Sequence, residues 1–155
     1  MMKTIRILGK TVIILGMVSL IAGAVFLFMG FSKQHFLVAA MRSENITLGD
    51  LGITGPDASK LVDSMSTAQI AGDTVRSHRH GIAPNYEAVL GGGRFDPTNP
   101  QQLTYMQAMN LEDYLYLSVA SFGLVYVVLG SGAITMLTGI SLLLIGIALQ
   151  KLPDK

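Results

Sequence analysis

The sequence predicts an all-α membrane protein, a two-span transmembrane helical hairpin that carries a small, mostly helical extracytoplasmic domain. Two uncharged apolar stretches, residues 11–32 and 114–150, lie near the two ends of the 155-residue chain. About 20 apolar residues in a helix cross the hydrocarbon core of a bilayer, so each stretch is long enough to span it. Glycines recur every seven residues in both stretches, and this spacing keeps one side of each helix bare for close packing.

Residues 1–10 are predicted to form a cytoplasmic N-terminus, since they hold three basic residues and no acidic one: Lys3, Arg6 and Lys10. The apolar stretch that follows is longer than the apolar core of a usual signal peptide, which favours a retained anchor over a cleaved leader. Cleavage near Ala39-Ala40 is the alternative. We expect the first helix, transmembrane over residues 11–32, to continue beyond the membrane through residues 35–42.

The second apolar stretch is predicted to be one long helix that contains the second transmembrane span. Its 37 residues would reach about 55 Å, which exceeds the thickness of the hydrocarbon core. We therefore expect residues 114–122 to project from the bilayer and to pack against the external domain. The alternative splits this stretch into two short spans around Gly130-Ser131-Gly132.

Charge sets the predicted orientation. Residues 151–155 hold two lysines and one aspartate, whereas residues 33–113 hold six basic and nine acidic side chains. Because positively charged flanks favour the cytoplasmic side, both termini are predicted to lie in the cytoplasm and residues 33–113 outside. The expected location is the cytoplasmic membrane, crossed an even number of times.

The external domain is predicted to begin with an extended piece at residues 45–48, followed by a helical turn or short helix within residues 57–65. Ser66 and Gln69 have the spacing of a capping box, which predicts a helix over about residues 67–80. Gly81 is a suitable residue to end that helix.

A turn at residues 82–85, a short helix or apolar segment at 86–90 and a flexible connector at 91–93 are expected next. Asn99 then has the character of an N-cap, with Pro100 at the first helical position and Gln102 completing a second box-like signal. The last helix is therefore predicted to start near Pro100 and to run into the membrane without a break.

The glycine spacing predicts close helix packing at a left-handed crossing near +20°, because a repeat of seven matches that geometry. The candidate packing residues on the first helix are Gly9, Gly16, Ser19, Gly23 and Gly30. Those on the second are Gly123, Gly130, Gly132, Thr135, Gly139 and Gly146. The two faces could pair with each other, with a partner subunit, with a second copy of the chain, or with a bound lipid or pigment.

Histidines and methionines in the external domain raise the question of a metal site. His78 and His80, with His35 and Asp73 nearby in the sequence, could join the soft ligands Met41, Met65, Met106 and Met109 in a copper-type site. Two histidines that are two residues apart on a helix do not share a face, however. We therefore predict no metal and no cofactor, and keep His78 and His80 as the candidates of an alternative hypothesis.

Other motifs carry little chemistry. Asn45-Ile46-Thr47 is a candidate N-glycosylation sequence on the predicted outer side. Glu112 and Asp113 are expected to form a solvated helix face. Neither span contains an ionisable residue, which argues against a pump or transporter acting alone. The formal net charge of +1, without a basic stripe, predicts no nucleic-acid partner, and the absence of cysteine excludes disulfides.

Several short sequences occur in a recognisable order, namely Thr67-Ala68-Gln69, Ala71, Ser77-His78, Tyr86 to Leu90, and Ser118 to Gly123. From about residue 60 onward, this order resembles small two-span bacterial membrane proteins of unknown function, which are frequent in actinobacteria and neighbouring groups. Some of these carry the name aromatic ring-opening dioxygenase, but no set of two histidines and one carboxylate is evident here. The resemblance implies two spans with an outer loop and supplies no catalytic residue.

The leading hypothesis is therefore a non-catalytic accessory or structural subunit of a multi-subunit complex, which docks on other membrane-protein subunits and lipids through its glycine-rich faces. A copper-type metal-handling protein on the outer side and a homo-oligomeric membrane scaffold are the alternatives.

Overall fold

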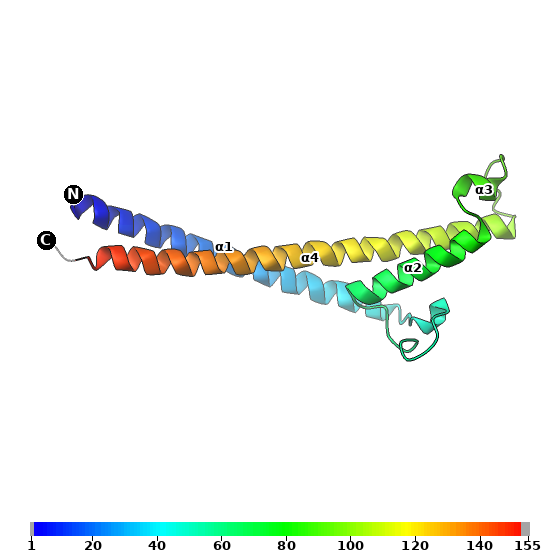
Figure 1. Cartoon of the computed structure of the whole chain (residues 1–155), viewed down its shortest axis with the longest axis horizontal. Coiled ribbons are helices and arrows are strands. Elements are labelled where there is room, and N and C mark those ends of the chain that lie inside the picture. Colours follow the sequence, from blue (N-terminus) through cyan, green and yellow to red (C-terminus); the bar gives the residue numbers. More distant parts are fainter. Residues whose placement is uncertain (1, 153–155) are drawn as a thin grey trace. The chain divides into compact units, whose positions relative to one another are not determined.

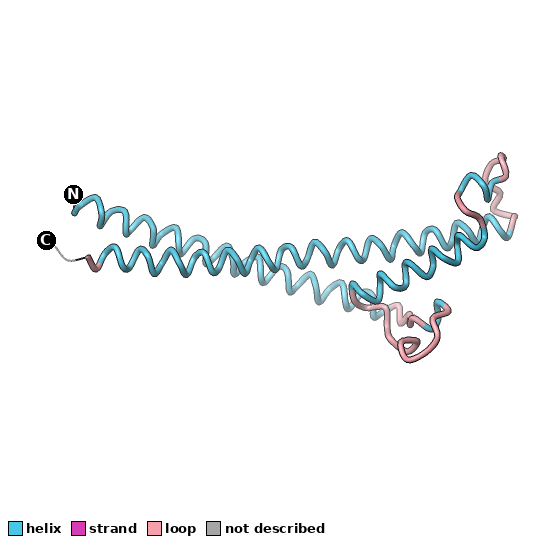
Figure 2. The backbone as a smooth tube through the Cα atoms, in the orientation of Figure 1, coloured by secondary structure: helices cyan, strands magenta, loops and turns pink. Residues whose placement is uncertain are grey.

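The computed structural model describes residues 2–152, and among these residues it contains helices and no strand. The elements are α1 (Met2–Ser43), the short 3-10 helix η1 (Gly49–Leu51), α2 (Met65–Ile82), α3 (Tyr86–Leu90) and α4 (Pro100–Gln150) (Figure 1). Figure 2 shows the loops between α1 and α2 and around α3. The end of the predicted cytoplasmic tail, residues 153–155, lies outside the described residues.

The helices α1 and α4 are both long and apolar enough to cross a membrane. Their large apolar side chains point mostly outward: Ile21 and Phe28 of α1 are 67% and 75% exposed, and Leu137 of α4 is 65% exposed. A core helix of a soluble protein buries such side chains. The exposure is therefore the pattern expected of helices that face lipid.

The chain divides into two compact units, and each of the long helices contributes to both. Unit 1 comprises residues 1–34 and 124–155, and unit 2 comprises residues 35–123. In unit 1, α1 and α4 run antiparallel, so that the start of α1 and the end of α4 lie at the same end (Figure 1). The apolar residues 114–123 belong to unit 2, as expected if these turns pack within the domain formed by the central segment.

Unit 2 has its own small core. It consists of buried residues from the first loop, α2 and α4, namely Leu48, Val62, Ala68, Ala71, Val75 and Leu115. Small residues on α2 bring it close to α4, since a Cβ atom at Gly72 would lie 3.2 Å from the ring of Tyr116. The side chain of Tyr105, near the start of α4, is also almost fully buried.

The loop between α1 and α2 differs from its predicted form. Only Thr47 forms a bridge, antiparallel to Leu61, and the Val62 N–H donates to the Ile46 carbonyl at 2.9 Å. Asn45 is not extended as predicted. Its φ is +52°, in the left-handed region, because it follows the last turn of α1 and ends the helix. Residues 57–60 form a turn closed by the Lys60 N–H and the Asp57 carbonyl at 3.0 Å, so of the two predicted forms, a helical turn or a short helix, the structure has the turn.

The predicted cap of α2 is wrong by two residues. The N-cap is Ser64, whose hydroxyl accepts from the Thr67 N–H at 3.2 Å, while the Thr67 hydroxyl accepts from the Ser64 N–H at 3.1 Å. The side chain of Gln69 instead donates to Asp73 at 3.0 Å. The backbone bond of Val62 holds the incoming chain extended up to Ser64, so the helix begins directly after it. At the other end, α2 continues through Gly81 to Ile82.

Replacing Ser64 by alanine is expected to destabilise unit 2 by about 1 kcal/mol, because an N-cap hydroxyl satisfies a helix N–H that is otherwise unpaired. Hydrogen exchange of the first amides of α2, measured in detergent micelles, checks this prediction. Ser77→Ala is the matched control, since Ser77 is an exposed serine farther along the same helix. Equal acceleration in both variants would contradict the assignment of Ser64 as the cap.

The later elements begin where their local signals predict. The Asn85 side chain accepts from the Ala88 N–H at 2.8 Å at the start of α3, and Asn99 accepts from the Gln101 N–H at 3.0 Å at the start of α4. Gln102 departs from the box-like expectation, because its side-chain oxygen accepts from the Asp96 N–H at 2.7 Å. As predicted, α4 continues without a break, and the alternative split at residues 130–132 does not occur.

Candidate functional site

In unit 1, six of the predicted packing glycines form one contact, which we call the glycine seam. It pairs Gly9 with Gly146, Gly16 with Gly139, and Gly23 with Gly132. A Cβ atom built on Gly16 would lie 2.9 Å from the Gly139 carbonyl oxygen, and one built on Gly139 would lie 2.9 Å from the Gly16 carbonyl oxygen. The two backbones therefore lie so close that a Cβ atom would not fit between them, an approach that favours van der Waals contact and weak C–H···O bonds.

The other predicted packing residues lie outside the seam. A Cβ atom on Gly30 would meet the Leu129 side chain at 2.5 Å, and one on Gly123 or Gly130 would meet nothing within 4 Å. Ser19 and Thr135 are half-buried, and the Thr135 hydroxyl donates within its own helix to the Ser131 carbonyl at 2.7 Å. The six seam glycines are thus closed against each other, whereas Gly123 and Gly130 stay open.

A buried ion pair joins α2 to α4 in unit 2. The Arg79 guanidinium donates to both carboxylate oxygens of Glu112, at 2.7 and 3.3 Å, and also to the Tyr105 hydroxyl. The Arg79 and Glu112 side chains are only 11% and 9% exposed. The hydrogen bond to Glu112 is the main cause that raises the pKa of Arg79 above its usual value, so the guanidinium keeps its charge.

The expectation of a solvated face at Glu112 and Asp113 is therefore wrong for Glu112 and holds only for Asp113, which is exposed. A sequence signal for this burial exists, because Glu112 is seven residues after Tyr105 and three before Leu115, on one stripe of α4. Tyr105 and Leu115 are both buried. This stripe indicates that Glu112 is buried, but it does not show which residue Glu112 pairs with. The partner, Arg79, lies on another helix.

A second polar contact between the same helices lies at the surface. The Tyr116 hydroxyl donates to the Asp73 carboxylate at 2.7 Å, and the Gln69 amide donates to it at 3.0 Å. The bond from Tyr116, followed by that from Gln69, lowers the pKa of Asp73 below its usual value. The same bond to Asp73 raises the pKa of Tyr116.

The contact between Asp73 and Tyr116 is expected to give a window of pH stability. The pKa of Asp73 is lower in the folded protein than in the unfolded chain. Its contribution to the stability of unit 2 is therefore complete above about pH 4 and is lost as the pH falls through the folded pKa. Because the folded pKa of Tyr116 is raised, its contribution is complete below about pH 10 and is lost as the pH rises through the folded value.

Asp73→Asn should therefore let the Tyr116 phenol ionise at a lower pH than in the unchanged chain. The ultraviolet absorbance of phenolate during an alkaline titration measures this shift, with Tyr116→Phe identifying the signal of that tyrosine. Glu87→Gln, which removes an exposed carboxylate on α3, is the control. An unchanged titration in Asp73→Asn would contradict the contact.

The candidate metal ligands are not brought together. His78 and His80 are both exposed; the His78 ring lies beside Gly52, and His80 Nε2 lies 3.3 Å from the Arg79 guanidinium. Within residues 2–152, no group of three or more His, Asp or Glu side chains is placed to hold a metal ion. His78 and His80 are therefore not joined by a third His, Asp or Glu ligand among the described residues.

The candidate glycosylation residue has a structural role. Asn45 is exposed and its left-handed conformation ends α1, a position that asparagine tolerates better than most residues. The Thr47 hydroxyl of the same motif donates to the Asp50 carboxylate at 2.7 Å. The motif therefore contributes to the loop whether or not a sugar is attached.

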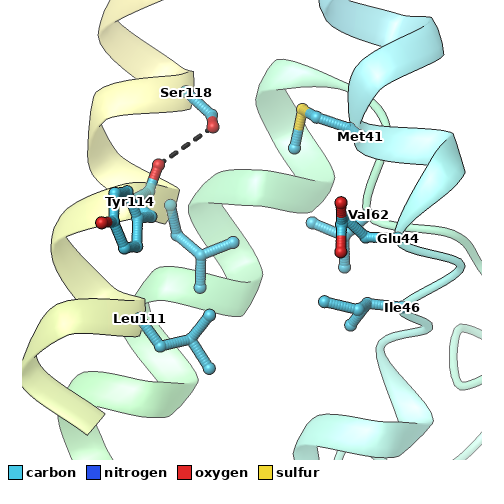
Figure 3. A pocket seen from close by; sticks show the side chains of 8 residues that line it. Met41, Glu44, Ile46, Val62, Leu111, Tyr114 and Ser118 are labelled. Carbon is cyan, nitrogen blue, oxygen red and sulfur yellow. Dashed lines mark hydrogen bonds between the residues drawn. The ribbon is translucent and has the colours of Figure 1, made fainter. Parts of the chain in front are cut away.

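Sequence reasoning missed one feature of unit 2, an open groove of about 300 Å³ between the end of α1 and α4 (Figure 3). We call it the unit 2 groove, and its lining residues are Met41, Glu44, Ile46, Val62, Leu111, Tyr114, Leu115 and Ser118. Tyr114 is 69% exposed at its edge. The Ser118 hydroxyl already donates a hydrogen bond to the Tyr114 carbonyl at 2.9 Å. The Glu44 carboxylate is therefore the main polar group that a bound molecule could contact in the groove.

Comparison with protein-family models, with curated proteins and with solved structures finds no match for this chain. The resemblance to two-span bacterial membrane proteins therefore stays a prediction, and the interpretation of the site depends on its geometry.

Proposed function

We propose that this protein is a non-catalytic accessory subunit of a complex in the cytoplasmic membrane. In this proposal unit 1 is a hairpin anchor in the bilayer, and unit 2 is a small outer module that binds a partner subunit through the unit 2 groove. The unit 2 groove here takes the docking role that was expected of the glycine faces from their spacing, because the six seam glycines are closed against each other.

The dimensions of unit 1 support the membrane placement. Lys10 and Lys33 border the 22 uncharged residues of α1, which as a helix measure about 33 Å, the thickness of a hydrocarbon core. The seam pairs this stretch with the part of α4 that precedes Lys151. The excess length of the second apolar stretch then lies in unit 2, and the positive flanks favour termini in the cytoplasm.

The observation that carries the proposal is the open apolar groove with Tyr114 exposed at its edge. Binding surfaces between proteins are commonly built from such aromatic and aliphatic side chains in a concave patch, with polar groups at the rim. Two ion pairs between separate segments hold unit 2 together, since Arg79 pairs with Glu112 and Arg42 pairs with Asp63, each at 2.7 Å.

Purification of the tagged full chain from its native membranes in a mild detergent tests the proposal. We expect a second membrane protein to co-purify, and we expect Tyr114→Ala to abolish that co-purification. Tyr86→Ala is the matched control, because Tyr86 is also an exposed tyrosine of unit 2 but lies on α3, away from the groove. A chain that runs as a monomer or as a pure homo-oligomer would refute the proposal, as would an unchanged complex in Tyr114→Ala.

A further inference from the structure

A separate apolar hollow lies in unit 1, beyond the end of the glycine seam. It has a volume of about 190 Å³. Its lining residues come from α1 and α4 and are Met29, Gly30, Lys33, Leu124, Val125 and Val128. We call it the Lys33 groove, because Lys33 supplies its only charged side chain.

The sequence of α4 explains why the helices do not close here. Continuing the series Gly146, Gly139 and Gly132 by another seven residues leads to Val125, which is not a glycine. On α1 the series does continue, and Gly30 meets the branched side chain of Leu129 in place of a bare backbone. The bulk of Val125 and Leu129 keeps the two backbones apart, and the hollow is the space that remains beside them.

A second hollow of about 160 Å³ adjoins the first, since Val128 lines both. Its other lining residues are Phe26, Val127 and Ser131. On α1, Phe26, Met29 and Lys33 are spaced by three and four residues, so they form one stripe that rises by about 10 Å along the helix. The result is an apolar track that ends at Lys33, whose apolar stem lines the hollow.

Such a track matches the two parts of a membrane amphiphile. In the proposed membrane placement, on which this inference depends, Lys33 follows directly after the uncharged stretch of α1 and so lies at the level of the lipid headgroups. Lysine side chains at that level extend their charge toward the headgroups and keep their methylene stems in the apolar region. The track below Lys33 then lies at the depth of the acyl chains.

We propose that the Lys33 groove binds a phospholipid with an anionic headgroup, whose phosphate contacts the Lys33 ammonium and one of whose acyl chains lies along Met29, Val128 and Phe26. The charge of Lys33 selects the headgroup, because a zwitterionic lipid presents a compensating cation beside its phosphate. The apolar track increases the residence time of the bound lipid but does not discriminate between headgroups.

The test reconstitutes the full chain into vesicles of equal parts phosphatidylglycerol and phosphatidylcholine, followed by mild detergent extraction and native mass spectrometry of retained lipid. We expect phosphatidylglycerol to be retained in preference, and Lys33→Gln to reduce that preference about fivefold, the factor that one lysine contributes near an anionic surface. Lys10→Gln, which removes the lysine at the other end of the same apolar stretch, should leave the preference unchanged.

Filling the track provides a second variant. Val128→Trp should reduce the retention of both lipids, whereas Leu137→Trp, at a side chain of α4 that is 65% exposed and lines neither hollow, should not. Equal retention of the two lipids by the unchanged chain would overturn the inference, as would an equal effect of Lys33→Gln and Lys10→Gln. If Val128→Trp, purified from native membranes, loses a co-purifying protein while its lipid retention in vesicles is unchanged, the groove binds a partner helix and the inference is overturned.

The two proposals fail separately in these experiments. Resistance of the chain to alkaline extraction from the vesicles reports whether it is inserted in the bilayer. An inserted chain without lipid preference refutes the lipid site and leaves the accessory role untouched, while loss of the partner complex in native membranes bears only on the accessory role.

Discussion

Replacing Gly139 by alanine is expected to weaken the pairing of α1 and α4 by about 1–3 kcal/mol, the usual cost of overpacking a close contact. The added Cβ atom would lie 2.8 Å from the Leu20 backbone nitrogen and 2.9 Å from the Gly16 carbonyl oxygen. Backbone atoms cannot rotate out of the way as a side chain can, so the helices must separate. Because no hydrophobic effect drives helix association within lipid, little else offsets the lost contact.

Gly130→Ala is the matched control on the same helix. The same methyl group there meets nothing within 4 Å, and alanine favours a helix over glycine by up to about 1 kcal/mol in water. We expect this variant to be neutral or slightly more stable, so a single chemical change has opposite signs at two glycines nine residues apart.

The chain contains no cysteine, which allows site-specific labelling to measure the pairing. Dyes attached to cysteines introduced at the exposed positions Val18 and Leu137 report the approach of α1 and α4 by energy transfer during a denaturing-detergent titration. Equal shifts of the transition in Gly139→Ala and Gly130→Ala would show that the seam does not hold the hairpin.

Glu112→Gln is expected to destabilise unit 2 by about 3–5 kcal/mol, because removing one partner of a buried ion pair leaves the other charge without compensation. Glutamine has almost the same shape as glutamate, so the loss reports charge and not a cavity. The Arg79 side chain, 11% exposed, would remain between α2 and α4 with the Tyr105 hydroxyl as a neutral partner. The protection of α2 amides from hydrogen exchange in micelles measures the effect.

The neighbouring residue offers the control for this experiment. Asp113→Asn removes an exposed carboxylate one position further along α4 and should change stability by less than about 0.5 kcal/mol. A double replacement, Arg79→Met with Glu112→Leu, should recover most of the stability, because well-packed apolar side chains can replace a buried pair. A single replacement that costs no more than Asp113→Asn would contradict the burial of the pair.

The starts of α3 and α4 could be predicted from the sequence, because Asn85 and Asn99 act on amides two or three residues away. The start of α2 could not be predicted in this way. Ser64 and Ser66 are each followed, three residues later, by a residue that can complete a capping box, namely Thr67 and Gln69. The choice between them depends on the bridge between Thr47 and Leu61, which is a contact between separate parts of the loop. The same limit applies to Glu112, whose partner is 33 residues distant.

None of the hollows described above was predicted from the sequence. The unit 2 groove depends on where the end of α1 and the loop residue Val62 lie relative to α4. The Lys33 groove follows from one valine in place of a glycine, but its existence also requires the register that sets Gly30 beside Leu129. The spacing of residues along a helix shows which of them share a face. It does not show which face of another helix packs against that one.

The sequence by itself determined that the chain forms two long apolar helices with glycines on one side of each, because helix formation, length and periodicity depend on residues within a few turns of one another. The tertiary structure decided that these two glycine faces meet each other in register, that Glu112 is buried against Arg79, and that Lys33 borders a hollow. These outcomes depend on residues far apart along the chain, whose proximity is set by the packing of whole helices and not by any local pattern.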